Sequence, residues 1–258
     1  MKEGHCKLCL KYKKLCRESH IVPRFMYKHI TGDNNELVFI DAQSATHKFN
    51  SEYEGNILCE DCDSGIIGKL DDYFAKFIHG EFPNVIRPRF ERMDNRNIIV
   101  RENDPHYDYN RFKLFLLSLL WRASISSRPL FGQIKLPQEI EEDLRQRILN
   151  QQPGEPDLYA CFIHLPPITT DQQGRTGFHT FYMPTMSPIY MEKGDLRMCE
   201  FIIEGVHYYF IIARPSNMNV EPAVDKNKLT LAFSTIDDQN KLINQIVAYA
   251  KSHKRKRD

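Results

Sequence analysis

The stretch NILCEDCDSGIIGKLDDYF at residues 56–74 contains the pair Cys59-x-x-Cys62, and a second such pair, Cys6-x-x-Cys9, lies near the start of the chain. Together the two pairs supply four thiolates, which is the tetrahedral ligand set that structural zinc prefers. The alternative is a set of buried free thiols, and the two acids inside the second pair argue mildly against it. The pattern therefore predicts a zinc site that joins two distant segments.

The remaining cysteines fit this interpretation. The chain has 7 cysteines, and in a reducing compartment they are not expected to form a disulfide framework. Cys16 is an alternative ligand, but we expect it to be a packed thiol.

Composition bounds the function classes. The 258 residues include 35 Lys and Arg against 34 Asp and Glu, a net charge of +1, so a nucleic-acid footprint must be a local patch. The basic N-terminus has no apolar run behind it, and the longest apolar run, Phe115 to Trp121, is too short to span a bilayer. We expect a cytoplasmic protein without membrane contact.

The chain divides by composition into an N-terminal, cysteine-rich part and a C-terminal part with regular secondary structure. The predicted units are a module at 1–82, a polar, proline-punctuated linker at 83–109, a mixed helix and antiparallel-sheet domain at 110–252, and a basic tail at 253–258. The tail is interpreted as a solvated end rather than a phosphate-contacting arm.

Hydrophobic periodicity predicts the elements of the C-terminal part. Helices are expected at Arg111–Ser126, Pro137–Leu149 and Asp237–Ala250, with a hairpin turn at Glu204-Gly205. Strands are expected at Leu158–Leu165, Phe178–Met183, Met198–Ile203, Val206–Ala213 and Leu229–Phe233.

The segment SHIVPRFMYK at residues 19–28, followed by the cysteine-rich stretch at 56–74, resembles the HNH, or ββα-metal, endonucleases. The similarity is to a bacterial subgroup that opens with Cys-x-x-Cys and carries a Ser-His-Ile-(Ile/Val)-Pro core. It implies an α+β fold in which a small zinc-stapled ββα-metal module precedes the C-terminal domain.

The resemblance also implies roles for individual residues. His20 stands where the family has its general base, which activates the attacking water. Asp63, directly after Cys62, stands at the position of the catalytic metal ligand, and a carboxylate there suits Mg²⁺ or Mn²⁺. Asn56 is the expected middle residue of the triad, although it lies closer to Cys59 than the pattern leads one to expect.

Arginines and further acids complete the predicted site. Arg24 is expected to neutralise the phosphate or hold the leaving group, and Arg17 to contact substrate. The sequence departs from the family at Ser19, where many members have an Asp as second metal ligand. Asp72, rather than Asp71, is expected to help bind the metal, with plain surface charge as the alternative for both.

The function implied is a metal-dependent endonuclease that cuts DNA, with RNA the less favoured substrate. The alternative is a non-catalytic zinc module that binds nucleic acid or a protein. Kinship with the subgroup, which extends to WRASISSRP at residues 121–129, implies anti-phage defence. A further possibility is that the C-terminal domain senses an effector or binds a partner and so regulates the nuclease. Arg122 is interpreted as either a phosphate contact or an ordinary charge at a helix end. The sequence leaves open whether the chain forms a homodimer.

Overall fold

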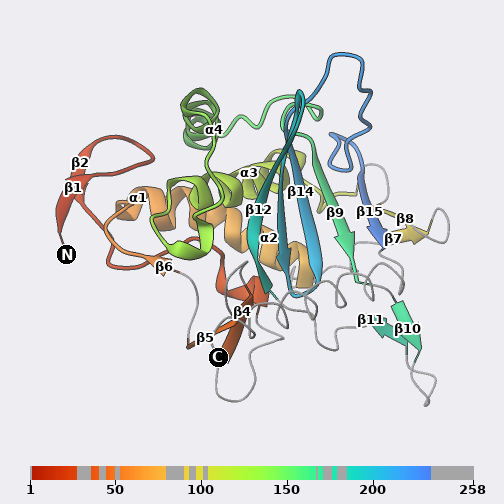
Figure 1. Ribbon diagram of the computed structural model, residues 1–258, viewed down its shortest axis with the longest axis horizontal. Helices are drawn as coiled ribbons and strands as arrows, with labels where there is room; N and C mark the ends of the chain where they lie inside the picture. Colours follow the sequence, from red (N-terminus) through yellow and green to blue (C-terminus); the bar gives the residue numbers. More distant parts are fainter. Residues whose placement is uncertain are drawn as a thin grey trace, which may run out of the picture.

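The computed structural model describes residues 2–27, 36–40, 45–49, 53–79, 90–92, 97–100, 104–166, 168–170, 176–178 and 185–233 (Figure 1). The fold is mixed α+β, as predicted. Helices pack against one face of a single large sheet (Figure 1). The cysteine-rich N-terminal part, with its short strand pairs, lies beside these helices.

The N-terminal part contains two short antiparallel strand pairs and a long helical run. Its strands pair antiparallel, β1 with β2 and β3 with β6, so the segments on either side of residues 28–52 meet. The elements are β1 (Glu3–His5), β2 (Tyr12–Lys14), β3 (Ser19–His20), the 3-10 helix η1 (Arg24–Tyr27), β6 (Tyr53–Glu54), α1 (Glu60–Cys62), the π-helix η2 (Asp63–Ile67) and α2 (Gly68–His79).

The large sheet has nine strands in the order β5-β4-β12-β13-β14-β9-β15-β8-β7. Its pairs are antiparallel except β12 with β4 and β15 with β9. The strands are β4 (Glu36–Ile40), β5 (Ala45–Phe49), β7 (Phe90–Arg92), β8 (Asn97–Val100), β9 (Cys161–Leu165), β12 (Thr185–Lys193), β13 (Leu196–Ile203), β14 (Val206–Ala213) and β15 (Leu229–Phe233). A separate antiparallel pair is formed by β10 (Ile168–Thr170) and β11 (Thr176–Phe178).

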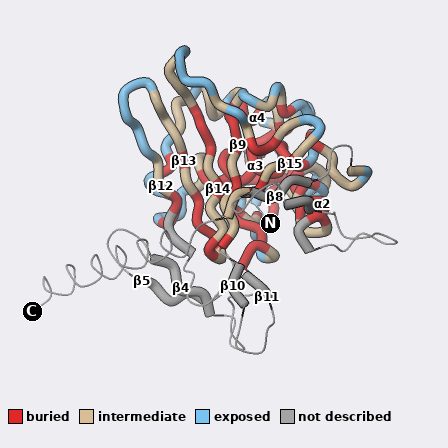
Figure 2. The backbone as a smooth tube through the Cα atoms, turned by 90° about the vertical axis from the view of Figure 1, so that its right-hand side faces the viewer, coloured by how far each residue is buried: buried red, intermediate tan, exposed pale blue. Residues whose placement is uncertain are grey.

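Helix α3 (Tyr109–Ile125) is the centre of the hydrophobic core. Every side chain from Phe112 to Ala123 is buried, because the helix packs against α2 on one side and α4 (Gln138–Asn150) on another while the sheet covers it (Figure 2). Phe115 stacks on Phe74 of α2 with ring centroids 3.8 Å apart. The 3-10 helix η3 (Pro129–Phe131) follows, and the buried Leu130 and Phe131 extend the core.

The predicted helices at 111–126 and 137–149 correspond to α3 and α4, and the predicted strands at 198–203, 206–213 and 229–233 to β13, β14 and β15. The hairpin turn is confirmed, since Glu204 and Gly205 have φ of 50° and 74°, a left-handed pair that suits a tight hairpin. Strand β9 begins at Cys161 rather than at Leu158, because residues 156–159 form a turn. Strand β12 was not predicted from the sequence. Of the predicted strand at 178–183, residues 179–183 lie outside the described residues, as do the predicted helix at 237–250 and the tail at 253–258.

The units that were predicted from composition share one large sheet and one hydrophobic core in the structure. Residues 83–109, predicted as a linker, include β7 and β8 of the large sheet, and β4 and β5 of the predicted module pair at its other edge. One hydrophobic cluster contains Leu8 and Cys62 together with Leu144 and Phe210. The core therefore runs without interruption from the cysteine-rich part to the sheet.

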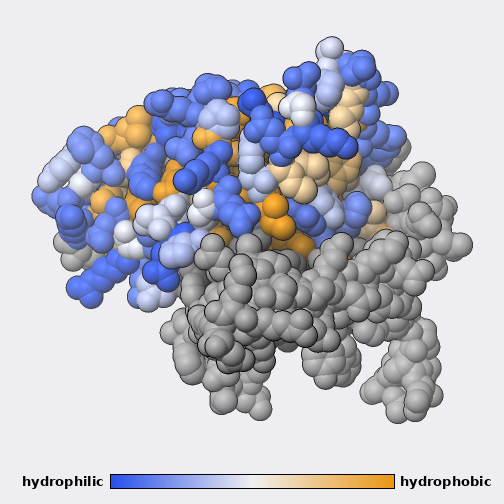
Figure 3. All heavy atoms as spheres, in the orientation of Figure 1, coloured by the Kyte–Doolittle hydropathy of each residue, from blue (hydrophilic) through white to orange (hydrophobic). Residues whose placement is uncertain are grey.

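The part of the surface that Figure 3 shows in colour is mostly hydrophilic, with hydrophobic side chains between the polar ones. Of the helices that the structure describes, none combines the length and the apolar character needed to cross a membrane.

Candidate metal centre and active site

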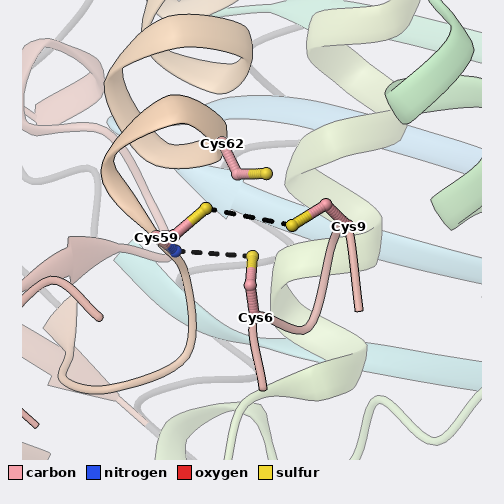
Figure 4. Close-up of side chains that lie close together, drawn as sticks. All are labelled: Cys6, Cys9, Cys59 and Cys62. Carbon is pink, nitrogen blue, oxygen red and sulfur yellow. Dashed lines mark hydrogen bonds between the residues drawn. The ribbon is translucent and has the colours of Figure 1, made fainter. Parts of the chain in front are cut away.

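Four cysteines from two distant segments meet at one point. Cys6 and Cys9 lie on the turn after β1, and Cys59 and Cys62 lie at the start of α1, with one ligand atom of each within 4.8 Å of all the others (Figure 4). The Sγ atoms of Cys9 and Cys59 are 3.9 Å apart. Two thiolates bound to one zinc ion at 2.3 Å in a tetrahedron lie about 3.8 Å apart, so the four thiols fit this ion.

The backbone shapes both halves of this centre. The first turn closes when the Leu10 amide donates to the Cys6 carbonyl at 2.8 Å, which puts Leu10 in the left-handed region at φ 60°. In the second half, the Cys62 and Asp63 amides donate to the Cys59 carbonyl, and the Cys59 amide donates to Cys6 Sγ at 3.4 Å. The second pair therefore opens a helix whose first residue outside the centre is Asp63.

The thiols influence one another electrostatically. Burial raises the pKa of the Cys62 and Cys59 thiols, and the Cys6 thiol nearby raises both further. For Cys9, burial acts to raise the pKa, but hydrogen bonds from the Lys11 backbone and from the other thiols outweigh it and the pKa is lowered. A divalent cation at this point would reverse the burial effect, because a coordinating thiol is deprotonated.

Cys16 lies outside this group. Its thiol is buried and faces Glu60, with Sγ 3.5 Å from the carboxylate. Burial, together with the nearby carboxylates of Asp63 and Glu60, raises its pKa to about 12. Such a thiol packs as a small apolar side chain, as expected from the sequence.

Next to the cysteine centre, His20 and Asp63 belong to one cluster of charged groups. His20 ends strand β3 and Asp63 opens the π-helix η2. Burial raises the pKa of Asp63, while the Ser19 hydroxyl, Arg122 and His20 act to lower it and Asp71 acts to raise it. The hydroxyl of Ser19 is fully buried, and no group among the described residues forms a hydrogen bond of normal geometry with it. An unsatisfied polar atom beside a half-buried carboxyl is the kind of position that a bound cation or water fills.

The π-helix explains why Asp71 joins this cluster. In a regular α-helix each residue turns the chain by about 100°, so a residue eight positions after Asp63 would lie roughly 80° away from it. The π-helix turns the chain by less per residue and brings Asp71 back toward the face of Asp63. Single π-helical turns of this kind are frequent at functional sites.

Arg122 of α3 binds two members of this cluster, His20 and Asp71. Its Nη1 donates to the His20 carbonyl at 3.0 Å, and its Nη1 and Nη2 bind Asp71 Oδ2 and Oδ1 at 3.0 and 2.9 Å. Burial raises the pKa of the Asp71 carboxyl, and Arg122 and then His20 act against this effect. The Arg122 side chain is only 1 % exposed, so it is neither a phosphate contact nor a solvated charge at a helix end.

The other predicted residues lie around this cluster rather than in it. Asp72 is 63 % exposed and pairs with Lys76 at 2.6 Å, one turn along the same helix. Arg17 and Arg24 are exposed, on either side of β3. Asn56 is exposed and left-handed at φ 62°, and its amide donates to the Cys16 carbonyl at 2.9 Å. Gly55 before it is packed so closely on Arg17 that a Cβ would lie 2.4 Å from the Arg17 carbonyl oxygen.

Among the described residues, the cysteines are the one group of three or more Cys, His or acidic residues close enough to share an ion. His20, Asp63 and Asp71 therefore do not form a ready-made three-ligand cage. A catalytic cation at Asp63 would depend on this carboxylate, the neighbouring Ser19 hydroxyl, water and substrate.

Two features of the site had no clear signal in the sequence. The engagement of Arg122 depends on packing between α2 and α3. The π-helix follows from no residue pattern that we recognise, although Gly65 inside it and Gly68 directly after it mark a place where a regular helix is weakened.

No protein-family model matches this chain, and neither a curated protein nor a solved structure matches it.

Proposed function

We propose that the chain is a metal-dependent endonuclease of the HNH type that hydrolyses phosphodiester bonds in DNA. The observation that carries the proposal is the placement of His20 at the end of a short strand and of Asp63 at the first helical residue after the cysteine centre, where the two interact electrostatically. A structural zinc module needs its cysteines but has no use for a base and an acid beside one another.

The order of elements supports the same proposal. Strands β3 and β6 form a short antiparallel pair and a helical run follows them, which is the β-β-α order of the HNH module. The cysteine centre fixes the start of that helix, and a structural zinc ion there would stabilise elements that are too small to fold by themselves.

In the proposed reaction, His20 accepts a proton from the water that attacks the scissile phosphate. Asp63 would hold a Mg²⁺ or Mn²⁺ ion, which would supply Lewis-acid stabilisation of the charge on the phosphate. Arg24, exposed four residues after His20 at the end of β3, would contact a backbone phosphate of the substrate. Arg17, exposed before the same strand, extends this contact.

The setting of the activity is part of the proposal. The substrate is DNA rather than RNA, the compartment is the cytoplasm and the biological role is anti-phage defence. With a net charge of only +1, the chain has little long-range attraction for nucleic acid, so a protein partner, an effector or a second copy of the chain would bring it to its substrate.

A second function, a non-catalytic zinc module that binds nucleic acid or protein, is favoured by one observation. Leu10 and Tyr12 on the first cysteine hairpin are 54 % and 63 % exposed. Exposed apolar and aromatic side chains beside lysines are typical of surfaces that bind other macromolecules. This function needs the four cysteines and leaves His20 and Asp63 dispensable.

The test is cleavage of a supercoiled plasmid with Mg²⁺ or Mn²⁺ by the wild type, His20→Ala and Asp63→Asn. His207→Gln is the control, since His207 pairs with Glu200 in the large sheet. We expect His20→Ala to lower the cleavage rate by about 10²–10⁴-fold while the zinc content and circular dichroism spectrum are retained. Full activity of His20→Ala would remove the proposed base. Absence of cleavage by the wild type, with DNA binding that depends on the cysteines, would favour the second function.

A further inference from the structure

We infer that Arg122 is a positioning residue that holds His20 and Asp71 in place, so that the proposed active site is completed by helix α3 from outside the cysteine-rich part. The inference rests on the proposed function for its catalytic consequence. Its structural basis is the bond from Nη1 of Arg122 to the His20 carbonyl at 3.0 Å and the paired bonds to Asp71.

The guanidinium group is fully engaged by the protein. Nε donates to the Ser118 carbonyl at 3.2 Å, Nη1 to His20 and Asp71, and Nη2 to Asp71 and the Ser118 hydroxyl. Ser118 lies one turn earlier on the same helix, so it orients the planar group before the group reaches the other two residues. A side chain with all its nitrogens bound and 1 % exposure acts on substrate only through the residues that it holds.

Holding the carbonyl of His20 constrains the residue that carries the proposed base. Strand β3 comprises only Ser19 and His20, and its partner β6 comprises only two residues, so the sheet by itself gives His20 little support. Arg122 adds a charge-assisted hydrogen bond from a rigid, buried helix. The same guanidinium fixes Asp71, whose carboxyl interacts electrostatically with His20.

The end of α3 holds the neighbouring elements in a similar way. The Glu54 carboxylate of β6 accepts from the Ser126 hydroxyl at 2.7 Å and from the amide and hydroxyl of Ser127 at 2.9 and 2.8 Å. Lys7, between the first two cysteines, donates to the Ile125 carbonyl at 2.6 Å. The segment 122–127 thus contacts β3, β6 and the first cysteine pair. Within this segment, the contact to His20 is made by Arg122.

The experiment compares Arg122→Lys with Lys113→Met in the full-length, zinc-loaded protein. A lysine keeps the charge but cannot form two parallel bonds to Asp71 and reach the His20 carbonyl at the same time. Lys113 is the matched control, because it is a fully buried cation on the same helix whose Nζ binds the carbonyls of Glu155 and Pro156, away from His20.

We expect Arg122→Lys to lower kcat for plasmid cleavage by about 10- to 100-fold with KM little changed, since small misplacement of a catalytic group costs rate rather than binding. Lys113→Met should keep kcat even where it lowers the melting temperature. Guanidinium added to Arg122→Ala should restore part of the lost rate. Equal loss of kcat in Arg122→Lys and Lys113→Met would overturn the positioning role, because general stability would then explain both.

A second measurement separates this inference from the proposed function. The imidazole signals of His20, followed by NMR in wild type and Arg122→Lys, report the position of the ring whether or not the protein cleaves DNA. We expect them to shift or broaden in Arg122→Lys and to be unchanged in Lys113→Met. Unchanged signals in Arg122→Lys would refute the positioning role even if the wild type is an active nuclease. If the signals change in Arg122→Lys but the wild type does not cleave DNA, the positioning role of Arg122 is supported and only the proposed function is contradicted.

Discussion

The carboxylate of Asp71 and the guanidinium of Arg122 form a two-pronged ion pair, with Oδ1 2.9 Å from Nη2 and Oδ2 3.0 Å from Nη1. The pair links α2, which begins just after the cysteine centre, to the helix at the middle of the core. Because Arg122 is almost fully buried, this link is exposed to little competition from water.

Removal of one partner of this pair should be costly. Asp71→Asn leaves the buried Arg122 charge without its counter-ion, and we expect a loss of about 3–5 kcal/mol in the free energy of unfolding. Asp72→Asn is the control, because that carboxylate is exposed and its pair with Lys76 is worth under about 1 kcal/mol. Urea unfolding followed by circular dichroism measures both. Similar losses for the two variants would show that the Asp71 pair contributes no more than a surface pair.

The cysteine centre should determine whether the N-terminal part folds. We expect the purified protein to hold one zinc ion per chain, and Cys59→Ser to lose it together with the structure of β1, β2 and α1. Cys16→Ser should retain the metal, since Cys16 faces Glu60 instead of the other four thiols. Metal analysis and a chelator titration followed by circular dichroism test this expectation. Loss of zinc from Cys16→Ser, or its retention in Cys59→Ser, would contradict the ligand set.

Residue spacing was enough to predict that these four cysteines lie together, because two Cys-x-x-Cys pairs can each supply one half of a tetrahedral site. The long helices and the hairpin at Glu204-Gly205 were also predictable, since their signals are local. What the sequence could not provide are relationships between elements. Asp71 and Asp72 are adjacent acids on one helix, and only the π-helical turn and the packing of α3 leave the first 20 % exposed and the second 63 % exposed.

The same reason explains Arg122. Arginine near the C-terminal end of a helix usually faces solvent and interacts with the helix dipole. Here the Arg122 side chain is buried and donates a hydrogen bond to the His20 carbonyl of β3 instead of facing water. The domain boundaries inferred from composition met a similar limit, because the strand at 97–100 pairs with β15 from the C-terminal part of the chain, and the strand at 90–92 pairs in turn with the strand at 97–100.

The buried hydroxyl of Ser19 offers a sensitive test of what lies next to Asp63. If it has no partner in solution, Ser19→Ala removes an unsatisfied polar group and should leave stability unchanged or raise it by about 1 kcal/mol. Thermal unfolding with and without Mn²⁺ measures the effect. A loss of stability that appears only with Mn²⁺ would identify the hydroxyl as part of a cation site. A loss in both conditions would mean that the hydroxyl is hydrogen-bonded within the protein and would refute the expectation of an orphaned group.

Acid should loosen the contact between β6 and the end of α3. Burial acts to raise the pKa of Glu54, but hydrogen bonds from Ser126 and Ser127 outweigh it, so the folded pKa lies below the ordinary value of 4.5. The deprotonated carboxylate is therefore favoured by the fold, and its contribution to stability is fully present above pH 4.5 and is lost as the pH falls through the lower, folded pKa. Glu54→Gln should be less stable than wild type at neutral pH, and the difference should shrink as the pH falls below 4.5. Unfolding in urea between neutral and acidic pH, with the exposed Glu60→Gln as control, checks this. A difference between Glu54→Gln and wild type that stays constant over the whole range would show that Glu54 acts through packing and that its charge has no part in the contact.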